Sequence, residues 1–273
     1  MDGHLLRELE ARALSVRCDV VRMMGMARSD QLASSLSASD ILVWLYGAVL
    51  SVRPDEPLWE GRDRFVPGKA SVGPVLYAVL AERGFFKRDM LWGYRRLGSM
   101  LQAFADFRRT PGVDVSCGSP GMGPGISLGL ALALSDRNPA PCVFCLIGDG
   151  ELREGAVWEA LMASARHRPR NLIVIVDRNE LQTEGTTGKT ASLEPLEEKF
   201  EAFGWAAVRA DGHDMESLSA ALASLPGDRA RVIVAKTVRG KGIPSLERAT
   251  DSVRLDRQTT DRFLRELQGR PPR

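Results

Sequence analysis

Two polar side chains follow two apolar runs of the sequence, and together they could hold a divalent cation. Residues 143–147 and 172–176 are apolar, rich in β-branched residues and too short for free helices, which predicts two buried strands. Asp149 stands in a Gly-Asp-Gly turn directly after the first run, and Asn179 follows the second. Their oxygen atoms suit Mg²⁺ or Ca²⁺, and the flanking glycines let a ligand approach the backbone.

A helix between the two runs would bring these side chains together. Apolar residues recur there at helical spacing: Val157, Leu161 and Ala165. We expect Glu151 and Glu154 in the first turn of this helix, where the helix dipole favours carboxylates. In a right-handed βαβ unit both strands end at the same sheet edge, so Asp149 and Asn179 should converge. Two such ligands, a backbone carbonyl and a diphosphate would complete an octahedral Mg²⁺ site.

The rest of the chain alternates in the same way. Helices are predicted at residues 4–28, 41–50, 126–133, 195–203 and 215–223, strands at 205–210 and 231–235, and a polar loop at 179–190. This order predicts an α/β fold: a doubly wound, mostly parallel sheet with helices on both faces. Because no repeat, low-complexity tract or linker divides the sequence, we expect residues 1–273 to form a single domain.

Composition excludes several classes of function. The chain has 273 residues, of which 44% are hydrophobic. Its net charge is +2, and positive and negative residues are interspersed, so the sequence shows no basic cluster typical of nucleic-acid binding. We find no signal peptide and no segment that approaches a membrane span, so we expect a cytoplasmic protein without membrane association. Four cysteines are too few for a disulfide scaffold, and three scattered histidines make a zinc site improbable.

Nine segments resemble, in family order, the N-terminal region of transketolases, which carries the thiamine-diphosphate motif. They are SLSASDIL (35–42), RDRFVPGKA (62–70), LYAVLAERGFF (76–86), LGSMLQ (97–102), TPGVDVSCGSPGMGPGISLGLALA (110–133), GDGELREGAVWEA (148–160), LEPLEEKFEAFGW (193–205), DGHD (211–214) and AKTVRGKG (235–242). A lone Gly-Asp-Gly is weak evidence, but so many segments in one order are specific. The resemblance implies that the chain is a diphosphate-binding domain for thiamine diphosphate and Mg²⁺.

The resemblance also implies roles for individual residues. Asp149, Asn179 and the backbone carbonyl of Leu181 match the Mg²⁺ ligands of the family, while Gly148 and Gly150 match the glycines beside the cofactor phosphates. A turn residue and a helix cap are the structural alternatives for Asp149 and Asn179.

Two further family positions lie near the cofactor. Gly118, Ser119 and Pro120 match the loop that lies on it, with Pro120 where the family usually has leucine. Glu154 matches a glutamate that meets its counterpart across the dimer interface, which makes it a candidate catalytic residue of a proton network. A carboxylate that serves only the helix dipole is the alternative.

The chain departs from the family at three histidine positions that contact the cofactor and the sugar. Aligned by their flanking residues, these positions are Gln31, Ser71 and Phe104, which we therefore assign to the substrate pocket. Their replacement removes proton carriers and polar donors. It leaves open an intact cofactor site that acts on another substrate, or a degraded subunit. His213, in the DGHD segment, is expected to be structural.

The resemblance covers only part of a transketolase. The pyrimidine-binding and C-terminal domains, with the glutamate that activates the cofactor, are expected on a partner chain in an α2β2 assembly. The leading hypothesis is the N-terminal subunit of a split transketolase-like transferase that moves a two-carbon ketol or acyl unit and is active only with its partner. One alternative is decarboxylative carboligation or acyl transfer from a 2-oxo acid, and another is a non-catalytic structural or regulatory subunit.

Overall fold

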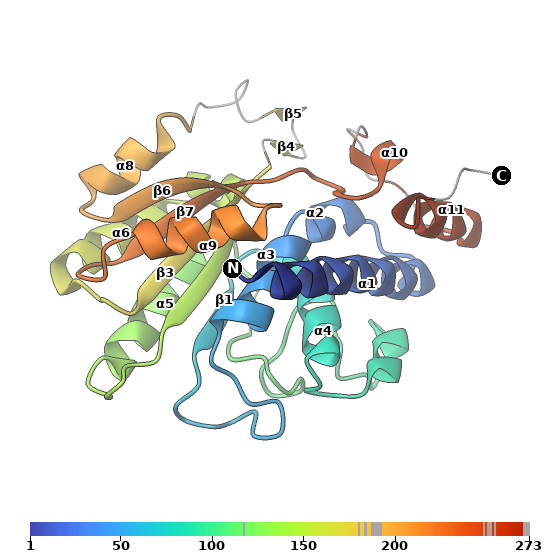
Figure 1. The fold of residues 1–273 in the computed structure, drawn as a ribbon, viewed down its shortest axis with the longest axis horizontal. Helices are drawn as coiled ribbons and strands as arrows, with labels where there is room; N and C mark the ends of the chain where they lie inside the picture. Colours follow the sequence, from blue (N-terminus) through green and yellow to red (C-terminus); the bar gives the residue numbers. More distant parts are fainter. Residues whose placement is uncertain are drawn as a thin grey trace.

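A parallel sheet forms the centre of the computed structural model, which describes residues 1–116, 118–179, 181–182, 185–186, 193–247, 249, 253 and 255–269. Within these residues five strands pair in parallel in the order β1, β2, β3, β7, β6 (Figure 1). They are β1 (Arg64–Pro67), β2 (Val143–Gly148), β3 (Leu172–Arg178), β6 (Ala206–Asp211) and β7 (Arg231–Lys236). The predicted α/β fold class and the four predicted strands are confirmed.

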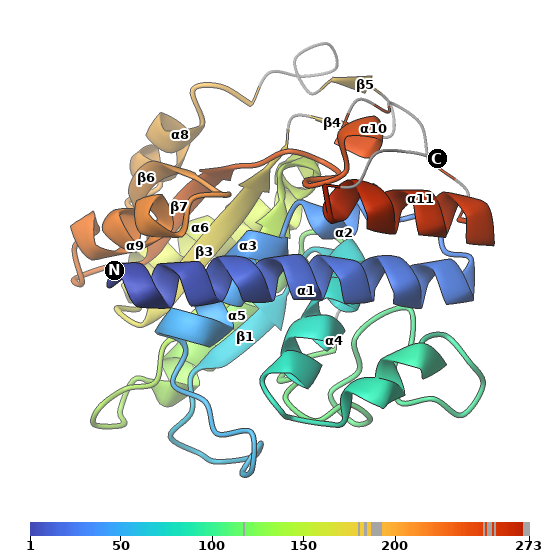
Figure 2. The same ribbon diagram turned by 45° about the vertical axis from the view of Figure 1, so that its right-hand side comes forward.

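Helices cover both faces of this sheet (Figures 1 and 2). One side carries α1 (Gly3–Ala27), α2 (Leu32–Leu36), α3 (Ser39–Trp44), α4 (Gly73–Glu82), α9 (Met215–Ser224) and α11 (Arg257–Leu267). The other carries α5 (Met122–Leu134), α6 (Gly155–His167) and α8 (Leu196–Ala202). The remaining short elements are η1 (Leu45–Val49), η2 (Ala70–Val72), η3 (Arg88–Gly93), η4 (Asp149–Arg153), β4 (Leu181–Gln182), β5 (Gly185–Thr186) and α10 (Pro244–Glu247).

Alternation along the strands divides the interior into two cores. In β2, Phe144 and Leu146 pack with the α1 side, whereas Cys145 and Ile147 pack with the α5 side. Successive side chains of a strand point to opposite faces, and both faces are covered here. This is why the strands appear in the sequence as continuous apolar runs.

Strand β1 is absent from the sequence prediction. It has only four residues, all buried, and it ends in Pro67 before Gly68, a composition that is typical of a loop. Its pairing with β2, from Arg64 beside Val143 to Pro67 beside Leu146, is what makes it a strand. As an edge strand it tolerates the proline.

The helix predicted to start directly after the Gly-Asp-Gly turn starts later. The 3₁₀ helix η4 occupies residues Asp149–Arg153, and α6 begins at Gly155 with Glu154 as its N-cap. Glu151 and Glu154 therefore do not lie in the first turn of α6. The polar loop predicted at 179–190 falls largely outside the described residues, and β4 pairs with β5 in its described part.

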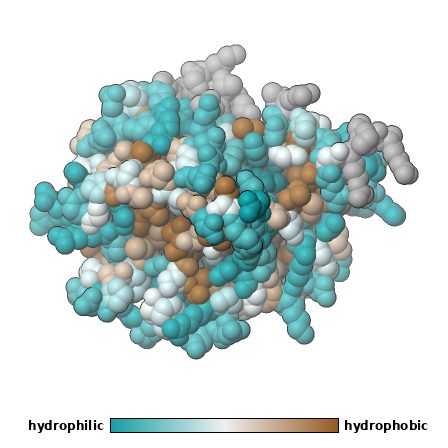
Figure 3. Space-filling model, viewed as in Figure 1, coloured by the Kyte–Doolittle hydropathy of each residue, from teal (hydrophilic) through white to brown (hydrophobic). Residues whose placement is uncertain are grey.

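One apolar stretch, Leu32–Val49, is long enough and apolar enough for a membrane span, contrary to the expectation from the sequence. It is divided among α2, α3 and η1, and 78% of it is buried. A helical stretch of this kind near the core of a globular protein passes the same test, so it is weak evidence for a membrane. Figure 3 shows a face on which hydrophilic residues predominate and apolar ones are exposed between them near its centre.

Candidate cofactor and metal site

The carboxyl edge of the sheet brings Asp149 and Asn179 to neighbouring strands. Gly148 of β2 pairs with Asp177 of β3, so Asp149 lies one residue beyond this pair and Asn179 two residues beyond it. Asp149 is buried, and Asn179 is half-buried. The expected convergence of the two strand ends is thus present in the backbone, and β4, which begins at Leu181, follows directly.

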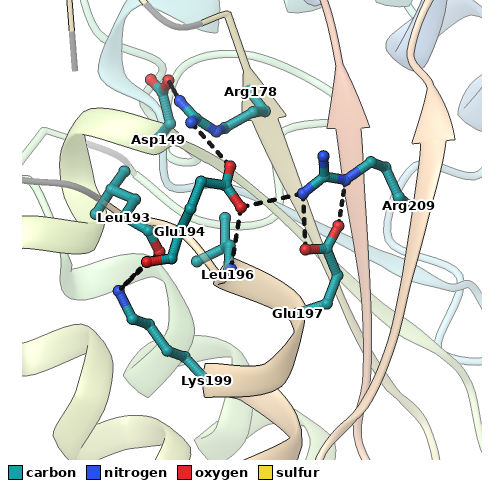
Figure 4. Close-up of polar contacts among 8 residues, drawn as sticks. All are labelled: Asp149, Arg178, Leu193, Glu194, Leu196, Glu197, Lys199 and Arg209. Atoms are coloured by element: carbon teal, nitrogen blue, oxygen red, sulfur yellow. Dashed lines mark hydrogen bonds and ion pairs between the residues drawn. The ribbon is translucent and has the colours of Figure 1, made fainter. Parts of the chain in front are cut away.

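The Asp149 carboxylate is already balanced by a cation of this chain. Arg178 Nη1 donates to Asp149 Oδ2 at 3.1 Å, and Arg178 Nη2 donates to Glu194 Oε1 at 3.0 Å (Figure 4). Arg209 contacts the other oxygen of Glu194 at 3.2 Å. Burial would raise the pKa of Glu194, but the hydrogen bond from Arg178 and further donors lower it. Alternating charges therefore connect the Gly-Asp-Gly turn to α8 and β6.

Glu151 ties the Gly-Asp-Gly turn to the loop before α5. Its two carboxylate oxygens accept hydrogen bonds from the backbone N–H of Gly148, at 2.8 Å, and of Gly121, at 3.0 Å. Burial raises the pKa of Glu151 despite these two donors. The sequence assigned this residue only to a helix dipole. The signal that could have found it is its position, three residues after Gly148, where a side chain can return to the backbone of the turn.

A cavity of about 290 Å³ lies beside this loop. Gly118 and Ser119 line it together with Gly68, at the end of β1, and the first turns of α5 with Met122 and Ile126. Pro120 is exposed in the same loop. The loop that the sequence assigned to the cofactor therefore borders a mainly apolar hollow next to the sheet edge, as a site for an organic cofactor requires.

A buried ion pair lies at the same edge of the sheet and joins Lys69, which follows β1, to Asp177 of β3. Lys69 Nζ lies 2.6 Å from Asp177 Oδ2, and Ser37 and Thr237 donate to the same carboxylate. Burial would raise the pKa of Asp177, but the Lys69 ammonium and these hydrogen bonds hold it below its ordinary value. The Lys69 side chain also passes over Gly148, whose added Cβ would lie 3.7 Å from it. Sequence reasoning missed both residues, because their pairing joins positions 108 apart.

The three residues assigned to the substrate pocket lie on adjoining segments. Ser71 shares a 2.8 Å hydrogen bond with Ser34 of α2, the helix that Gln31 precedes. Phe104, which is 48% exposed, lies in an open groove of about 670 Å³ formed by residues of the 102–109 loop and Ser116. The backbone of this loop at Ala103 approaches Gly73, two residues after Ser71. Their assignment to one pocket stays a prediction.

His213 takes part in a buried hydrogen-bond network. Its Nδ1 lies 2.7 Å from Asp40 Oδ2, and its Nε2 accepts from the backbone N–H of Val238 at 2.7 Å. Since Nε2 accepts, Nδ1 carries the proton. This arrangement agrees with the structural role expected for His213. Glu154, in contrast, is exposed at the start of α6, and its Cβ lies close under Gly121.

The residues at the sheet edge fit a magnesium diphosphate. Asp149 and Asn179 offer side-chain oxygens and Leu181 a backbone carbonyl, which is the hard donor set that Mg²⁺ prefers. Asp149 is buried, and its carboxylate accepts a charge-assisted hydrogen bond from Arg178.

Comparison with known proteins identifies the family. A family model described as the thiamine diphosphate binding domain of transketolase matches residues 10–254. The chain belongs to the transketolase family. The predicted family, fold class, thiamine diphosphate binding and type of enzyme, a transferase that depends on this cofactor, are thereby confirmed.

Several transketolase relatives have the length of this chain. The 6-deoxy-6-sulfo-D-fructose transketolase subunit SqwG of Clostridium sp. (strain MSTE9) is 36% identical over 237 residues, 86% of each chain. An apulose-4-phosphate transketolase subunit of Actinobacillus succinogenes is 34% identical over 88% of each chain. Both names describe one subunit of a transketolase.

Solved transketolases share the fold but are longer. The enzyme from Leishmania mexicana superposes with a TM-score of 0.86 at 27% identity and covers 97% of this chain. That from Campylobacter jejuni gives 0.85 at 28% identity and covers 100% of it. The chain spans 42% and 44% of these two structures.

Proposed function

We propose that this chain is the cofactor-binding subunit of a two-chain transketolase and that Asp149, Asn179 and the Leu181 carbonyl hold Mg²⁺ against the diphosphate of thiamine diphosphate. The observation that supports this most directly is the register of β2 and β3, because Asp149 and Asn179 follow the paired ends of these two strands. The chemistry of the donor set and the match to the cofactor-binding domain agree with it.

The chain's own residues would bind and orient the cofactor. Gly148 and Gly150 let the backbone approach the phosphates, and the loop of Gly118, Ser119 and Pro120 forms one wall beside the cavity. When bound, thiamine diphosphate would supply the nucleophilic carbon for the transfer of a two-carbon unit. Glu151 keeps the loop and the turn at a fixed separation, so that both can contact one ligand.

A partner subunit would complete the active site in an α2β2 assembly. Relatives of the same length are named as transketolase subunits, whereas this chain spans 42% of the Leishmania mexicana structure. Glu154 is exposed, as a residue that meets its counterpart at an interface between copies must be in a free chain. We propose this role for Glu154 and a cytoplasmic location for the complex.

The substrate is proposed to be a ketose or a compound derived from one, because the relatives act on such compounds by name. The pocket positions favour a donor less polar than the usual sugar phosphates. Phe104 presents a half-exposed ring, and the hydroxyl of Ser71 is already bonded to Ser34. If these residues line the pocket, a donor without a phosphate group, such as the 2-oxo acid pyruvate, is the second candidate.

The test is co-expression with the adjacent reading frame, followed by native mass spectrometry with Mg²⁺ and thiamine diphosphate. Turnover of xylulose 5-phosphate would support ketol transfer, and turnover of pyruvate alone the second candidate. The Asp149→Ala variant should lose Mg²⁺-dependent cofactor binding, because it lacks a charged ligand. A complex without measurable cofactor affinity would instead indicate a non-catalytic subunit.

A further inference from the structure

Arg178 bridges two carboxylates at the proposed metal site. It is the last residue of β3 and directly precedes Asn179. Its side chain is 9% exposed, and that of Asp149 only 4%. One arm of the guanidinium donates to Asp149 and the other to Glu194, at 3.1 and 3.0 Å (Figure 4). A planar fork can make two such bonds at once, which a lysine ammonium cannot do with the same geometry.

Among the contacts of the described residues, Arg178 bonds to one oxygen of Asp149. The guanidinium contacts Oδ2, and Figure 4 shows the second carboxylate oxygen directed away from Arg178. A carboxylate that binds a metal through one oxygen is commonly fixed by a hydrogen bond to the other. The bond from Arg178 therefore orients Asp149 without occupying both of its oxygens.

Glu194 in turn restrains Arg178. Besides its bond to Arg178, its other oxygen accepts from the backbone N–H of Leu196 and from Arg209, both at 3.2 Å. Glu194 is thus held by residues of α8 and β6. The position of Arg178 depends on these contacts as well as on its own strand.

We propose that Arg178 is a positioning residue of the metal site: it fixes Asp149 so that the second oxygen faces the metal, and Glu194 fixes Arg178. This inference rests on the proposed function, because it assumes that Asp149 is a metal ligand. A competing effect runs in the opposite direction. The positive charge of Arg178 repels a divalent cation, and if repulsion outweighed orientation, removal of the charge would strengthen metal binding.

The experiment measures Mn²⁺ affinity by electron paramagnetic resonance in the two-chain complex with thiamine diphosphate. Arg178→Gln should weaken Mn²⁺ binding by about 10- to 100-fold, the usual effect of losing a residue that orients a metal ligand. Arg178→Lys keeps the charge but not the fork, and it should recover only part of the loss. Glu194→Gln, at a half-exposed side chain, should weaken binding by a smaller factor without unfolding the chain.

Matched controls separate orientation from net charge. Arg166→Gln and Glu198→Gln change the charge by the same amounts at exposed positions of α6 and α8 and should leave Mn²⁺ affinity unchanged. Unchanged or tighter binding in Arg178→Gln, with normal binding in the wild type, would overturn the positioning role alone. A wild-type complex that binds neither Mn²⁺ nor the cofactor would overturn the proposed function, and this inference with it.

Discussion

At the scale of single residues, Glu151 shows how one side chain can set the distance between two ligand-binding loops. Both oxygens accept backbone N–H groups, one from the Gly-Asp-Gly turn and one from the loop before α5. A carboxylate can accept at both oxygens, whereas a glutamine amide accepts at one and donates at the other. The two backbone N–H donors therefore require a carboxylate at position 151, and a glutamine amide cannot replace it.

Glu151→Gln should weaken cofactor binding more than turnover. The variant leaves one buried N–H without an acceptor, at a cost of about 1–3 kcal/mol. If about half of that cost reaches binding, the concentration of thiamine diphosphate for half-maximal activity should rise about 2- to 12-fold. Activity at saturating cofactor should stay close to that of the wild type. Glu201→Gln, an exposed change on α8, is the control. An unaltered cofactor requirement would contradict the bridging role of Glu151.

At the scale of elements, the start of α5 crosses the end of β1 at two glycines. A Cβ on Gly123 would lie 2.8 Å from the Cα of Gly68 and 3.0 Å from Cys145 Sγ. The two backbones can approach this closely only because neither residue has a side chain. This crossing shapes the wall of the cavity beside the cofactor loop.

Gly123→Ala should destabilise the chain by about 1–3 kcal/mol, because the added methyl group meets backbone that has little room to move. Gly129→Ala is the matched control on the same helix, since its Cβ meets no described atom within 4 Å. That change should stabilise α5 by up to about 1 kcal/mol. Urea unfolding of both variants measures the difference. Equal stabilities would show that the crossing is looser than its geometry indicates.

At the scale of the whole molecule, the network of Asp40 joins segments from both ends of the sequence. Asp40 in α3 binds Arg17 of α1 and His213 after β6, and His213 continues to the backbone at Val238. Burial would raise the pKa of Asp40, but the hydrogen bond from His213 and the charge of Arg17 hold it below its ordinary value. Ala38 is the N-cap of α3, and Asp40 lies in the first turn of this helix.

This network should make stability sensitive to acid. The pKa of Asp40 is lower in the folded state than in the unfolded state. The ionised Asp40 therefore contributes fully to the free energy of unfolding above the unfolded-state pKa of about 3.9. This contribution is lost as the pH falls through the folded-state pKa. At pH 7, Asp40→Asn should cost about 3–5 kcal/mol, because Arg17 stays buried without its counter-charge.

The pH dependence supplies a second measurement. Urea unfolding between about pH 5 and pH 2 should show a shallower loss of stability in Asp40→Asn than in the wild type. The exposed Asp55→Asn is the control, and it should follow the wild-type curve. If the free energy of unfolding fell with pH in parallel for the wild type and Asp40→Asn, Asp40 would not contribute to the acid sensitivity.

Sequence reasoning predicted most of the fold because its signals are local. The apolar runs of β2 and β3 and the stripe of α6 show their period within a few residues. The sequence did not predict β1, because four residues that end in proline show no periodic pattern of apolar residues. It did not predict η4, because this tight turn depends on the hydrogen bond from the Gly148 N–H to Glu151. The candidate ligands Asp149 and Asn179 could be predicted from the sequence for the same reason as the strands, because each of them closely follows a predicted strand.

The amino-acid sequence by itself determined the α/β class, the order of the main elements, and the presence of a carboxylate and an amide after successive strands. Periodicity and turn residues act over short distances, and these features need nothing more. Only the tertiary structure decided which charges meet: Arg178 with Asp149 and Glu194, and Lys69 with Asp177. Such pairs form between residues far apart in the chain, and their partners depend on register, burial and the direction of each side chain.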